Sequence, residues 1–490
     1  MAASDQRFDV VVIGAGPGGY VAALRARQRG LSAAVIERDR LGGVCANQGC
    51  IPTKALLRSA EVYALARNAA SFGVTIEKVS FDIGAIAERA KKTAARMEKS
   101  VESLLRSAKI PVFQGSARLA GDHRVAVSGG ASGDLLLEAA HIVLATGARA
   151  RVPSGFESDG RIVWTYREAL TPAAMPRSIL VMGAGAIGVE FASFYRMLGA
   201  EVTLVEMLPR ILPMEDKDIS EAMRRAMTKQ GVRILTDAKV AAITKTDSSM
   251  TATVETGSDA AKKTETITAD HLLVATGISA NVEDLGLEQT KVRIERGHIV
   301  VDEWLATDEP GIYAIGDLVG PPWLAHKASR EAVICIDRIA GAGGLRSLAV
   351  DASPSCTYAM PQVASVGLTE EAAVASGRSV RCGRSTFVGN GKARALGDTE
   401  GFVKTVFDAD SGELLGAHMI GPEVTELVAT FALARTLEAT EEEILATVFP
   451  HPTLSEAVHE SVEAAFPVMA GVAGGQASGS APEPPARAKS

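Results

Sequence analysis

The sequence predicts an α/β protein that contains one strand–turn–helix–strand unit twice. Apolar runs at 8–13 and at 178–182 each meet a glycine-rich turn, and each turn precedes a helix and a second strand that ends in an acid. Aromatic residues make up only 4% of the chain, as in large α/β proteins with buried parallel strands. At 490 residues, the chain is long enough for about three domains.

Both glycine-rich turns follow the pattern G-x-G-x-x-G. Such glycines let the backbone approach a pyrophosphate at a helix N-terminus, and the acid accepts hydrogen bonds from a ribose diol. In both units, 23 residues separate the first glycine from the acid, and an Ala-Thr-Gly strand end follows later, at 145–147 and 275–277. We expect two Rossmann-like dinucleotide-binding domains, the alternative being an inactive second copy. The motif residues are Gly14, Gly16, Gly19 and Glu37 in the first unit, and Gly183, Gly185, Gly188 and Glu206 in the second.

The acid of the second unit discriminates between nicotinamide cofactors. Glu206 would repel the extra phosphate of NADP, whereas an NADP site would place Arg or Lys there. Arg210 lies close in sequence. Because of Glu206, the sequence favours NAD over NADP as the cofactor of the second unit.

A cysteine pair lies in the glycine-rich segment 41–54. In a regular helix, residues as far apart as Cys45 and Cys50 lie about 140° apart around the axis, so closing a disulfide requires an irregular stretch from Cys45 to Gly49. A helix beginning near Pro52 would place Cys50 at its N-terminus and Lys54 one turn further on, which favours a thiolate. We interpret the pair as a redox-active dithiol. The alternatives are two buried structural thiols or half of a zinc site, although no further Cys or His lies near in sequence and no metal is expected.

The remaining chain alternates between helical and strand-like segments. Helices are expected at 61–108, 423–437 and 454–465, strands at 111–119, 124–128, 141–147, 310–317, 362–366, 402–407 and 415–420, and a disordered tail at 471–490. Taken alone, Asp317 is more often a turn residue than a ligand. His451, between two prolines, is more often a loop or core residue than a base, but an acid follows it at Glu456.

Composition excludes several function classes. The formal net charge is −7 and the chain has no basic block, which argues against nucleic acid as a partner. No apolar run approaches the roughly 20 residues of a membrane span, and no signal peptide is recognisable. Five cysteines in 490 residues are no disulfide scaffold, so a reducing, cytoplasmic location is expected.

The cysteine motif, the two dinucleotide units and the segment His451-Pro-Thr-Leu-Ser-Glu456 together resemble the two-cysteine flavoprotein disulfide reductases, most closely the dihydrolipoamide dehydrogenase family. The resemblance runs from about Phe8 to Pro467. It implies an FAD domain at 1–150, an NAD domain at 151–279, a central domain at 280–350 that completes the FAD site, and an α+β dimer-interface domain at 351–470.

The resemblance also implies the site residues by matched position. FAD would be held by Gly14, Gly16, Gly19, Glu37, Lys54, the backbone around Gly115 and Ala117, Thr146, Gly147, Asp317 and the segment Trp323-Leu324-Ala325-His326. NAD would be held by Gly183, Gly185, Gly188, Glu206, Val240 and Gly277. Catalysis would use Cys45, Cys50, His451, Glu456, Lys54 and its partner Glu190.

The implied reaction is the oxidation of protein-bound dihydrolipoamide with reduction of NAD⁺. His451, oriented by Glu456, would remove a thiol proton, the thiolate would attack Cys45, and Cys50 would face the flavin. The resemblance implies a homodimer in which the histidine comes from the partner subunit. The expected partner is a lipoyl domain or carrier of a 2-oxoacid dehydrogenase or related complex.

The chain departs from the usual pattern of that family at four places: Val44-Cys45-Ala46-Asn47-Gln48 in the cysteine motif, Trp323, Gln362 and Phe449. They bear on partner choice and redox potential more than on the chemistry. Other NAD(P)H-dependent members, of the glutathione or mercuric reductase type, fit less well because Glu206 opposes NADP and no cysteine follows Cys382. Outside the enzymes, the alternative function is that of a non-catalytic flavoprotein scaffold or a redox sensor.

Overall fold

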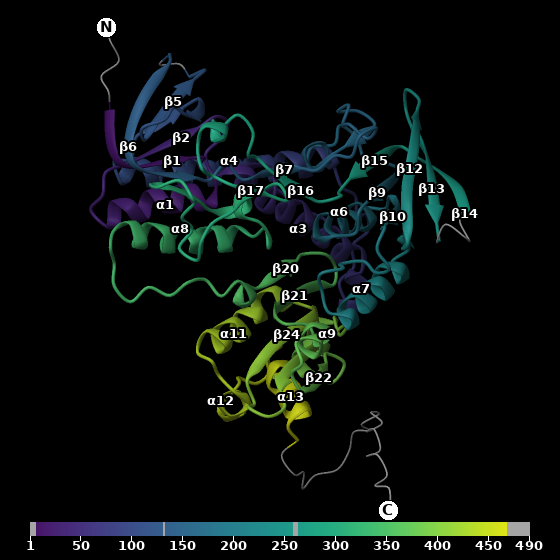
Figure 1. Cartoon of the computed structure of the whole chain (residues 1–490). Helices are drawn as coiled ribbons and strands as arrows, with labels where there is room; N and C mark the ends of the chain where they lie inside the picture. The colour runs from purple at the N-terminus through teal and green to yellow at the C-terminus, as the bar shows by residue number, and fades with distance from the viewer. Residues whose placement is uncertain (1–5, 131–132, 258–262, 468–490) are drawn as a thin grey trace, which may run out of the picture.

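The computed structural model describes residues 6–130, 133–257 and 263–467. The tail at 471–490 therefore lies outside the described residues. The two dinucleotide units lie side by side in the upper part of Figure 1, and the C-terminal part of the chain lies below them. Within the described ranges, no helix combines the length and the apolarity needed to cross a bilayer.

The first unit forms a mostly parallel sheet. Valines 10–12 are fully buried, because this central strand is covered on both faces and apolar β-branched residues suit that environment. Within the described residues the sheet has seven strands, in the order β3-β2-β1-β6-β5-β4, with β19 also paired to β6. Its strands are β1 (Gln6–Ile13), β2 (Ala33–Glu37), β3 (Val112–Gln114), β4 (Ser116–Leu119), β5 (Arg124–Ser128), β6 (Leu135–Leu144) and β19 (Ile312–Ala314), and its helices are α1 (Pro17–Gln28), α4 (Ile83–Ser107) and α8 (Ala325–Ile339).

The second unit repeats this arrangement with a parallel sheet. Among the described residues it has five strands, in the order β11-β10-β9-β15-β8, and a three-stranded antiparallel sheet packs beside it. The parallel strands are β8 (Val163–Trp164), β9 (Ser178–Met182), β10 (Glu201–Val205), β11 (Arg233–Leu235) and β15 (His271–Val274), the antiparallel ones β12 (Ala238–Lys245), β13 (Met250–Thr256) and β14 (Lys263–Ala269), and the helices α5 (Tyr166–Ala169), α6 (Ala186–Met197) and α7 (Lys217–Lys229). A two-stranded link, β7 (Ala148–Ala150) with β16 (Ile278–Ala280), connects the two units.

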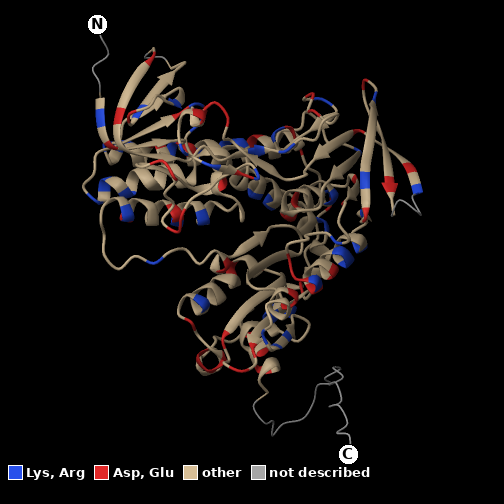
Figure 2. Cartoon of the chain, in the orientation of Figure 1, with Lys and Arg blue, Asp and Glu red and all other residues tan. Residues whose placement is uncertain are grey.

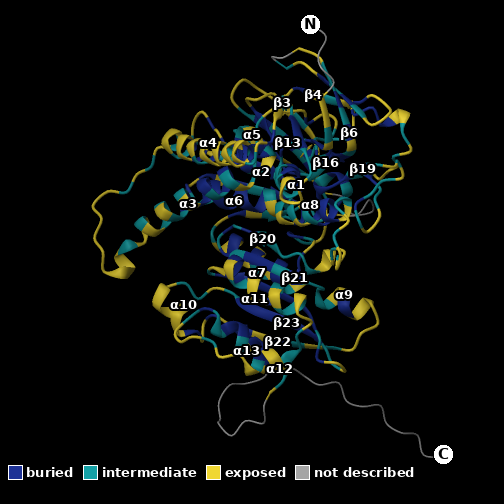
Figure 3. Cartoon of the chain, turned by 90° about the vertical axis from the view of Figure 1, so that its left-hand side faces the viewer, coloured by how far each residue is buried: buried dark blue, intermediate teal, exposed yellow. Residues whose placement is uncertain are grey.

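The C-terminal part forms an antiparallel sheet with helices against it, so the α+β prediction is confirmed. Its central strands are dark blue in Figure 3, in agreement with their almost complete burial. In the described residues the strand order is β20-β21-β24-β23-β22. The strands are β20 (Ser355–Thr357), β21 (Gln362–Gly367), β22 (Val380–Thr386), β23 (Phe402–Asp408) and β24 (Leu414–Gly421), and the helices α9 (Glu370–Ala375), α10 (Gly391–Leu396), α11 (Val424–Thr436), α12 (Glu441–Ala446) and α13 (Glu456–Ala465).

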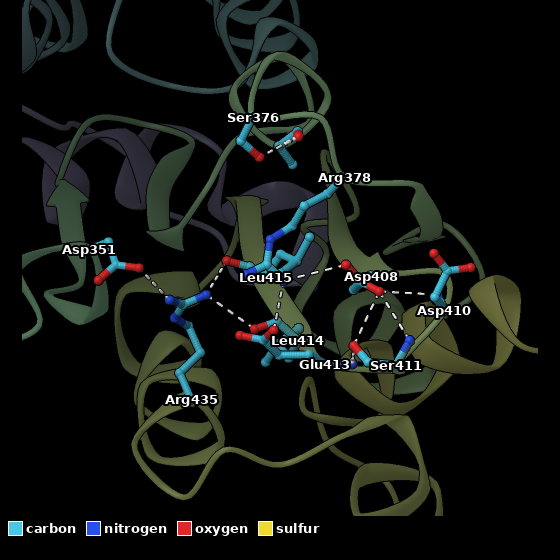
Figure 4. Close-up of polar contacts among 11 residues, drawn as sticks. Asp351, Ser376, Arg378, Asp408, Asp410, Ser411, Glu413, Leu414, Leu415 and Arg435 are labelled. Carbon is cyan, nitrogen blue, oxygen red and sulfur yellow. Dashed lines mark hydrogen bonds and ion pairs between the residues drawn. The ribbon is translucent and has the colours of Figure 1, made fainter.

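Two arginines fix the connection between β23 and β24 (Figure 4). Arg378 pairs with Glu413 at 2.7 Å and with Asp408 at 3.3 Å, across the turn that joins the strands. Arg435 pairs with Asp351 at 2.6 Å, and also donates hydrogen bonds to backbone carbonyl groups at the start of β24. The sheet is thereby tied to the segment that leads into it.

One helix prediction was wrong in extent. The stretch at 61–108 contains two helices, as expected, but they do not fill it: α3 (Cys50–Arg67) ends, a 3-10 helix at Ala69–Phe72 and an irregular segment follow, and α4 begins only at Ile83. Asp82 caps α4 by accepting a hydrogen bond from the Ala85 N–H at 3.1 Å. The sequence did not reveal the break, because the polar residues of both helices continue a single helical pattern. The cap that marks the start of α4 is only one contact, between Asp82 and Ala85.

Candidate functional site

The first glycine turn packs directly against the strands beside it. Gly14 has a φ of +102°, and a Cβ there would lie 2.3 Å from the Ala145 carbonyl oxygen. A Cβ on Gly19 would lie 1.9 Å from the Gly14 carbonyl oxygen, whereas one on Gly16 would meet nothing within 4 Å. The first and last glycines therefore permit close packing, and the middle one leaves the N-terminus of α1 open.

The second turn repeats these contacts. Gly183 has a φ of +104°, and its Cβ would lie 2.4 Å from the Ala275 carbonyl oxygen, while a Cβ on Gly188 would lie 1.9 Å from that of Gly183. Gly185 is again open. Among the described side chains, none caps the N-terminus of α1 or α6, so N–H groups of both first turns are available to a phosphate.

The two strand-end acids are bound in the same way. Glu37 accepts a hydrogen bond from the Ala15 N–H at 2.7 Å, and Glu206 accepts one from the Ala184 N–H at 2.7 Å. The other carboxylate oxygen of Glu206 accepts a hydrogen bond from the Leu208 N–H at 2.9 Å. Each acid is thus locked beside its glycine turn, where a ribose bound to that turn would lie.

Four other residues predicted to contact FAD lie around the edge of the first sheet. The Gly115 N–H donates to the Glu37 carbonyl at 2.9 Å, and Ala117 follows in β4. The Thr146 hydroxyl donates to the Asn281 carbonyl at 2.7 Å, and the Asn281 N–H donates to the Gly147 carbonyl at 2.9 Å. Asn281, which the sequence did not single out, therefore fastens this strand end.

The segment from Asp317 to His326 lies at the end of β19 and at the start of α8. Burial raises the pKa of Asp317. Trp323 is 41% exposed and stacks with His298, and the His326 imidazole bonds the Pro354 carbonyl at 2.7 Å. Leu324 is the N-cap of α8, and Ala325 is the first residue of that helix.

A buried ion pair that the sequence did not reveal supports this segment. Lys327 and Glu331, one helical turn apart in α8, approach to 2.7 Å with side chains only 3% and 4% exposed. The other oxygen of Glu331 accepts a hydrogen bond from the Gly316 N–H at 2.7 Å. The residue before Asp317 is therefore tied to α8.

Two residues that were predicted to bind NAD, Val240 and Gly277, also have roles in the packing and the backbone of the second unit. Val240 is buried in the core of the second unit, next to a β-bulge in β12, so only its backbone could face a ligand. Gly277 has a φ of +106° and its carbonyl accepts a hydrogen bond from the Arg151 N–H at 3.0 Å.

The cysteine pair lies at the junction of two helices. Cys45 is in α2 (Gly43–Gln48), and Cys50 is the first residue of α3. The sequence-based expectation of an irregular stretch from Cys45 to Gly49 was wrong in extent, because Gly49 alone of these residues is not helical, with φ −138° and ψ −113°. A single break suffices to turn α3 so that the two side chains meet.

The environment of the pair makes its two thiols unequal. Both cysteines are free, Cys45 half-buried and Cys50 exposed. A hydrogen bond from Cys45 lowers the pKa of Cys50, and the positive charge of Lys54 lowers it further. The same hydrogen bond, together with burial, raises the pKa of Cys45. Of the two thiols, Cys50 is therefore the one whose surroundings favour the thiolate.

Lys54 is fixed by an acid from the second unit. Its ammonium lies 2.8 and 2.9 Å from the two oxygens of Glu190, whose side chain is 7% exposed. The same ammonium lies 4.6 Å from the centre of the Tyr358 ring, and the Tyr358 N–H donates to Glu190 at 2.9 Å. Burial raises the pKa of Tyr358 to about 12, so this ring stays neutral. Nothing in the local sequence indicated Tyr358.

His451 and Glu456 form a second pair at the far end of the chain. The imidazole Nδ1 lies 2.7 Å from a Glu456 oxygen, and the other oxygen accepts a hydrogen bond from the Thr453 N–H at 2.9 Å. Both contacts lower the pKa of Glu456, and the hydrogen bond from Thr453 has the larger effect. The His451 side chain is 78% exposed. Because Nδ1 contacts Glu456, Nε2 is the ring nitrogen left for another partner.

A single chain does not bring this pair to the cysteines. α2 and α3 lie in the upper half of Figure 3, whereas α12 and α13, on either side of His451, lie at the bottom. Figure 1 shows the same separation of α3 from α13. The predicted base and the predicted thiols therefore lie in separate parts of the chain.

Two dinucleotide turns and a thiol pair beside the first one define a class of protein, the oxidoreductases that exchange electrons between a dithiol and nucleotide cofactors. The chain belongs to the pyridine nucleotide-disulphide oxidoreductase family, whose model matches residues 8–332, and the family's dimerisation-domain model matches residues 353–462.

Known relatives cover nearly the whole chain. It is 51% identical to a dihydrolipoyl dehydrogenase of Zymomonas mobilis over 459 residues, which span 94% of this chain and 98% of that protein. It is 48% identical over 476 residues to one of Rhizobium etli, with the same shares of the two chains. Among solved structures, LpdA from Mycobacterium tuberculosis matches with a TM-score of 0.86 at 27% identity, over 94% of this chain and 99% of that one.

Proposed function

We propose that this protein is a dihydrolipoyl dehydrogenase, which oxidises protein-bound dihydrolipoamide to lipoamide and reduces NAD⁺. The observation that carries the proposal is the placement of the thiol pair. A Cβ on Gly43, at the start of the thiol-bearing α2, would lie 2.7 Å from the Gly16 Cα, so this helix adjoins the first dinucleotide turn directly. The relatives named above support the choice of dihydrolipoamide as substrate.

The two nucleotide sites fit FAD and NAD. We assign FAD to the turn of Gly14, Gly16 and Gly19, within residues 1–150 and completed by 280–350, and NAD to the turn of Gly183, within 151–279. Both turns have close-packed glycines, an open helix N-terminus and a fixed acid. Bound FAD would supply the electron relay, accepting a pair from the dithiol and passing it as hydride to NAD⁺.

The residues of this chain supply the acid–base and thiol chemistry. With Nδ1 turned to Glu456, His451 Nε2 accepts the proton of a dihydrolipoamide thiol. The resulting thiolate attacks the Cys45 sulfur of the enzyme disulfide, the Cys45–Cys50 bond breaks, and Cys50 leaves as the thiolate that its lowered pKa favours. The second substrate thiol then displaces Cys45, so the substrate disulfide forms and the enzyme keeps both electrons as a dithiol.

The separation of His451 from the cysteines supports a homodimer, with residues 351–470 as the interface. One chain holds the two halves of the site apart, so two copies related by a twofold axis would complete two sites. The substrate would be a lipoyl domain or carrier of a 2-oxoacid dehydrogenase or related complex. A dithiol that cycles through a disulfide suits a reducing compartment, and we place the protein in the cytoplasm.

A subunit-mixing experiment tests the site and the dimer together. His451→Gln alone should lower NAD⁺ reduction by dihydrolipoamide by about 10³-fold or more, because the substrate thiol loses its base. Cys45→Ser alone should be inactive. After equal amounts are unfolded and refolded together, about a quarter of the wild-type rate should return, since half the dimers would carry one intact site.

The control is the wild-type protein refolded in the same way, which corrects for losses on refolding. An unmixed rate for His451→Gln near that of the wild type would remove His451 as the base. Failure of the mixture to recover activity, with both variants dimeric and yellow, would contradict the shared site.

A further inference from the structure

The loop that follows Glu206 is closed over the second glycine turn. The Ala184 N–H donates to the Glu206 carboxylate at 2.7 Å, and the Ala184 carbonyl accepts a hydrogen bond from the Leu212 N–H at 2.8 Å. Both ends of the segment 206–212 are thus attached to one residue of the turn. Arg210 lies within this segment, so its side chain is carried by the loop that borders the turn and follows Glu206.

An acid from outside the unit holds Arg210. Its Nη1 lies 2.8 Å from an oxygen of Glu371, with the two side chains 35% and 45% exposed. Glu371 is in the first turn of α9, below the second unit. Helix α7, which carries both blue and red residues in Figure 2, lies where the second unit meets this C-terminal part.

The position of Glu371 is itself fixed by its neighbour. Glu370 binds the buried ammonium of Lys404 at 2.7 Å, and its N–H donates to Asp216 at 3.2 Å. Asp216 belongs to the second unit and is fully buried. The first turn of α9 is therefore anchored against that unit by Glu370, next to the residue that binds Arg210.

The first unit contains the same arrangement. The Ala15 carbonyl accepts a hydrogen bond from the Gly42 N–H at 2.9 Å, which closes the loop after Glu37. Arg40 in that loop donates from Nε to Glu98 of α4 at 3.1 Å. In both units an arginine of the loop after the strand-end acid is thus paired with a glutamate of a helix, Glu98 of α4 in the first and Glu371 of α9 in the second.

We propose that Glu371 is a specificity-determining residue that keeps the second nucleotide site selective for NAD over NADP. This rests on the proposed assignment of that site to a nicotinamide dinucleotide. Glu206 repels a 2′-phosphate, but a free guanidinium four residues later would attract one, since arginine binds phosphate through paired hydrogen bonds. Glu371 occupies that guanidinium, and its own negative charge adds to the repulsion.

The test measures binding of adenosine 2′,5′-bisphosphate and of 5′-AMP to the FAD-loaded protein by calorimetry. In Glu371→Gln, the ratio of the two affinities should shift toward the bisphosphate by about two- to fivefold, the size expected for a partly exposed ion pair. The shift should shrink at high salt. Turnover with dihydrolipoamide is assayed separately, so loss of the proposed enzymatic function would not affect this measurement.

Two variants give the controls. Arg210→Met combined with Glu371→Gln should abolish the gain, because no guanidinium is left to receive the phosphate. Glu442→Gln removes the same charge from the exposed helix α12 and should leave the ratio unchanged. An unchanged ratio in Glu371→Gln, an equal gain in the double variant, or a wild-type protein that binds neither probe would each overturn the proposal.

Discussion

The two dinucleotide turns make matching backbone contacts, yet the segments that follow the two units differ. The N–H groups of Gly14 and Gly183 both donate at 2.8 Å to the strand beside them, and those of Ala15 and Ala184 both donate at 2.7 Å to the acid. These contacts are made within each unit. They fix the backbone that would bind a nucleotide, and they are the same in both units although the neighbouring residues differ.

The segments after the two acids differ. After Glu37, the chain passes through Gly42 and Gly43 into the helix that carries Cys45. After Glu206 it reaches Asp216 and Asp218, which approach the Lys404 ammonium at 2.9 and 2.7 Å. Burial alone would lower the pKa of Lys404, but its carboxylate partners raise it, so the lysine stays charged. The first segment supplies redox groups, and the second attaches the unit to the C-terminal sheet.

The largest expected effect comes from removing the thiol that follows the first unit. Cys45→Ser should lower dihydrolipoamide turnover by about 10⁴-fold or more, because a hydroxyl cannot form the enzyme disulfide. Reduction of an artificial dye by NADH should persist, since that path uses the two nucleotide sites alone. Steady-state rates with both electron acceptors measure the difference.

Cys382→Ser provides the matched control for that variant. This cysteine lies in β22 of the C-terminal sheet, and the variant should retain both activities. If Cys45→Ser also lost the dye activity while it kept its FAD, the thiols would not be separable from the nucleotide relay. The contrast between the two segments would then fail.

An intermediate effect should distinguish the two glycine turns. Gly19→Ala places a Cβ 1.9 Å from the Gly14 carbonyl oxygen and should lower FAD content, whereas Gly188→Ala places one equally close to Gly183 and should raise the KM for NAD⁺ about 100-fold with FAD content unchanged. The absorbance of bound flavin and the NAD⁺ dependence of the rate report the two outcomes.

Gly343→Ala is the control, because a Cβ there meets nothing within 4 Å. Equal loss of FAD in both turn variants would mean that the second turn also supports the flavin site, or that the substitution unfolds the protein. Circular dichroism separates these two explanations.

The sequence predicted the features that depend on short-range contacts. Both glycine turns, their acids and the pairing of His451 with Glu456 involve residues within one motif or one βαβ unit, and each has a recognisable spacing. Three strands of the C-terminal sheet, β21, β23 and β24, were predicted from their strand-like runs, and β23 and β24 are buried almost completely, whereas β20 and β22 were not predicted.

The features that the sequence did not predict depend on contacts between distant segments. Tyr358 lies beside Lys54, Glu371 beside Arg210, and Glu331 beside Gly316 only because the tertiary fold places them there. None has a local spacing that indicates its partner. The position of the helix break at Gly49 was also missed, because several glycines near it permit an irregular backbone and the sequence does not say which one is used.

The smallest expected effect concerns the charge that the first segment places beside its thiols. Lys54→Met removes a positive charge one helical turn from Cys50, and the pKa of Cys50 should rise because its thiolate loses that stabilisation. The hydrogen bond from Cys45, which is the larger cause, remains, so we expect the midpoint to move up by about one pH unit rather than to the value of a free thiol. Rates of alkylation of the reduced protein by iodoacetamide, measured against pH, give the midpoint. Lys239→Met, in the strand β12 of the second unit, removes the same charge elsewhere and should leave it unchanged. A midpoint that is equal in Lys54→Met and the wild type would mean that Glu190 neutralises Lys54 fully, so that the lysine positions helix α3 against the second unit instead of tuning the thiol.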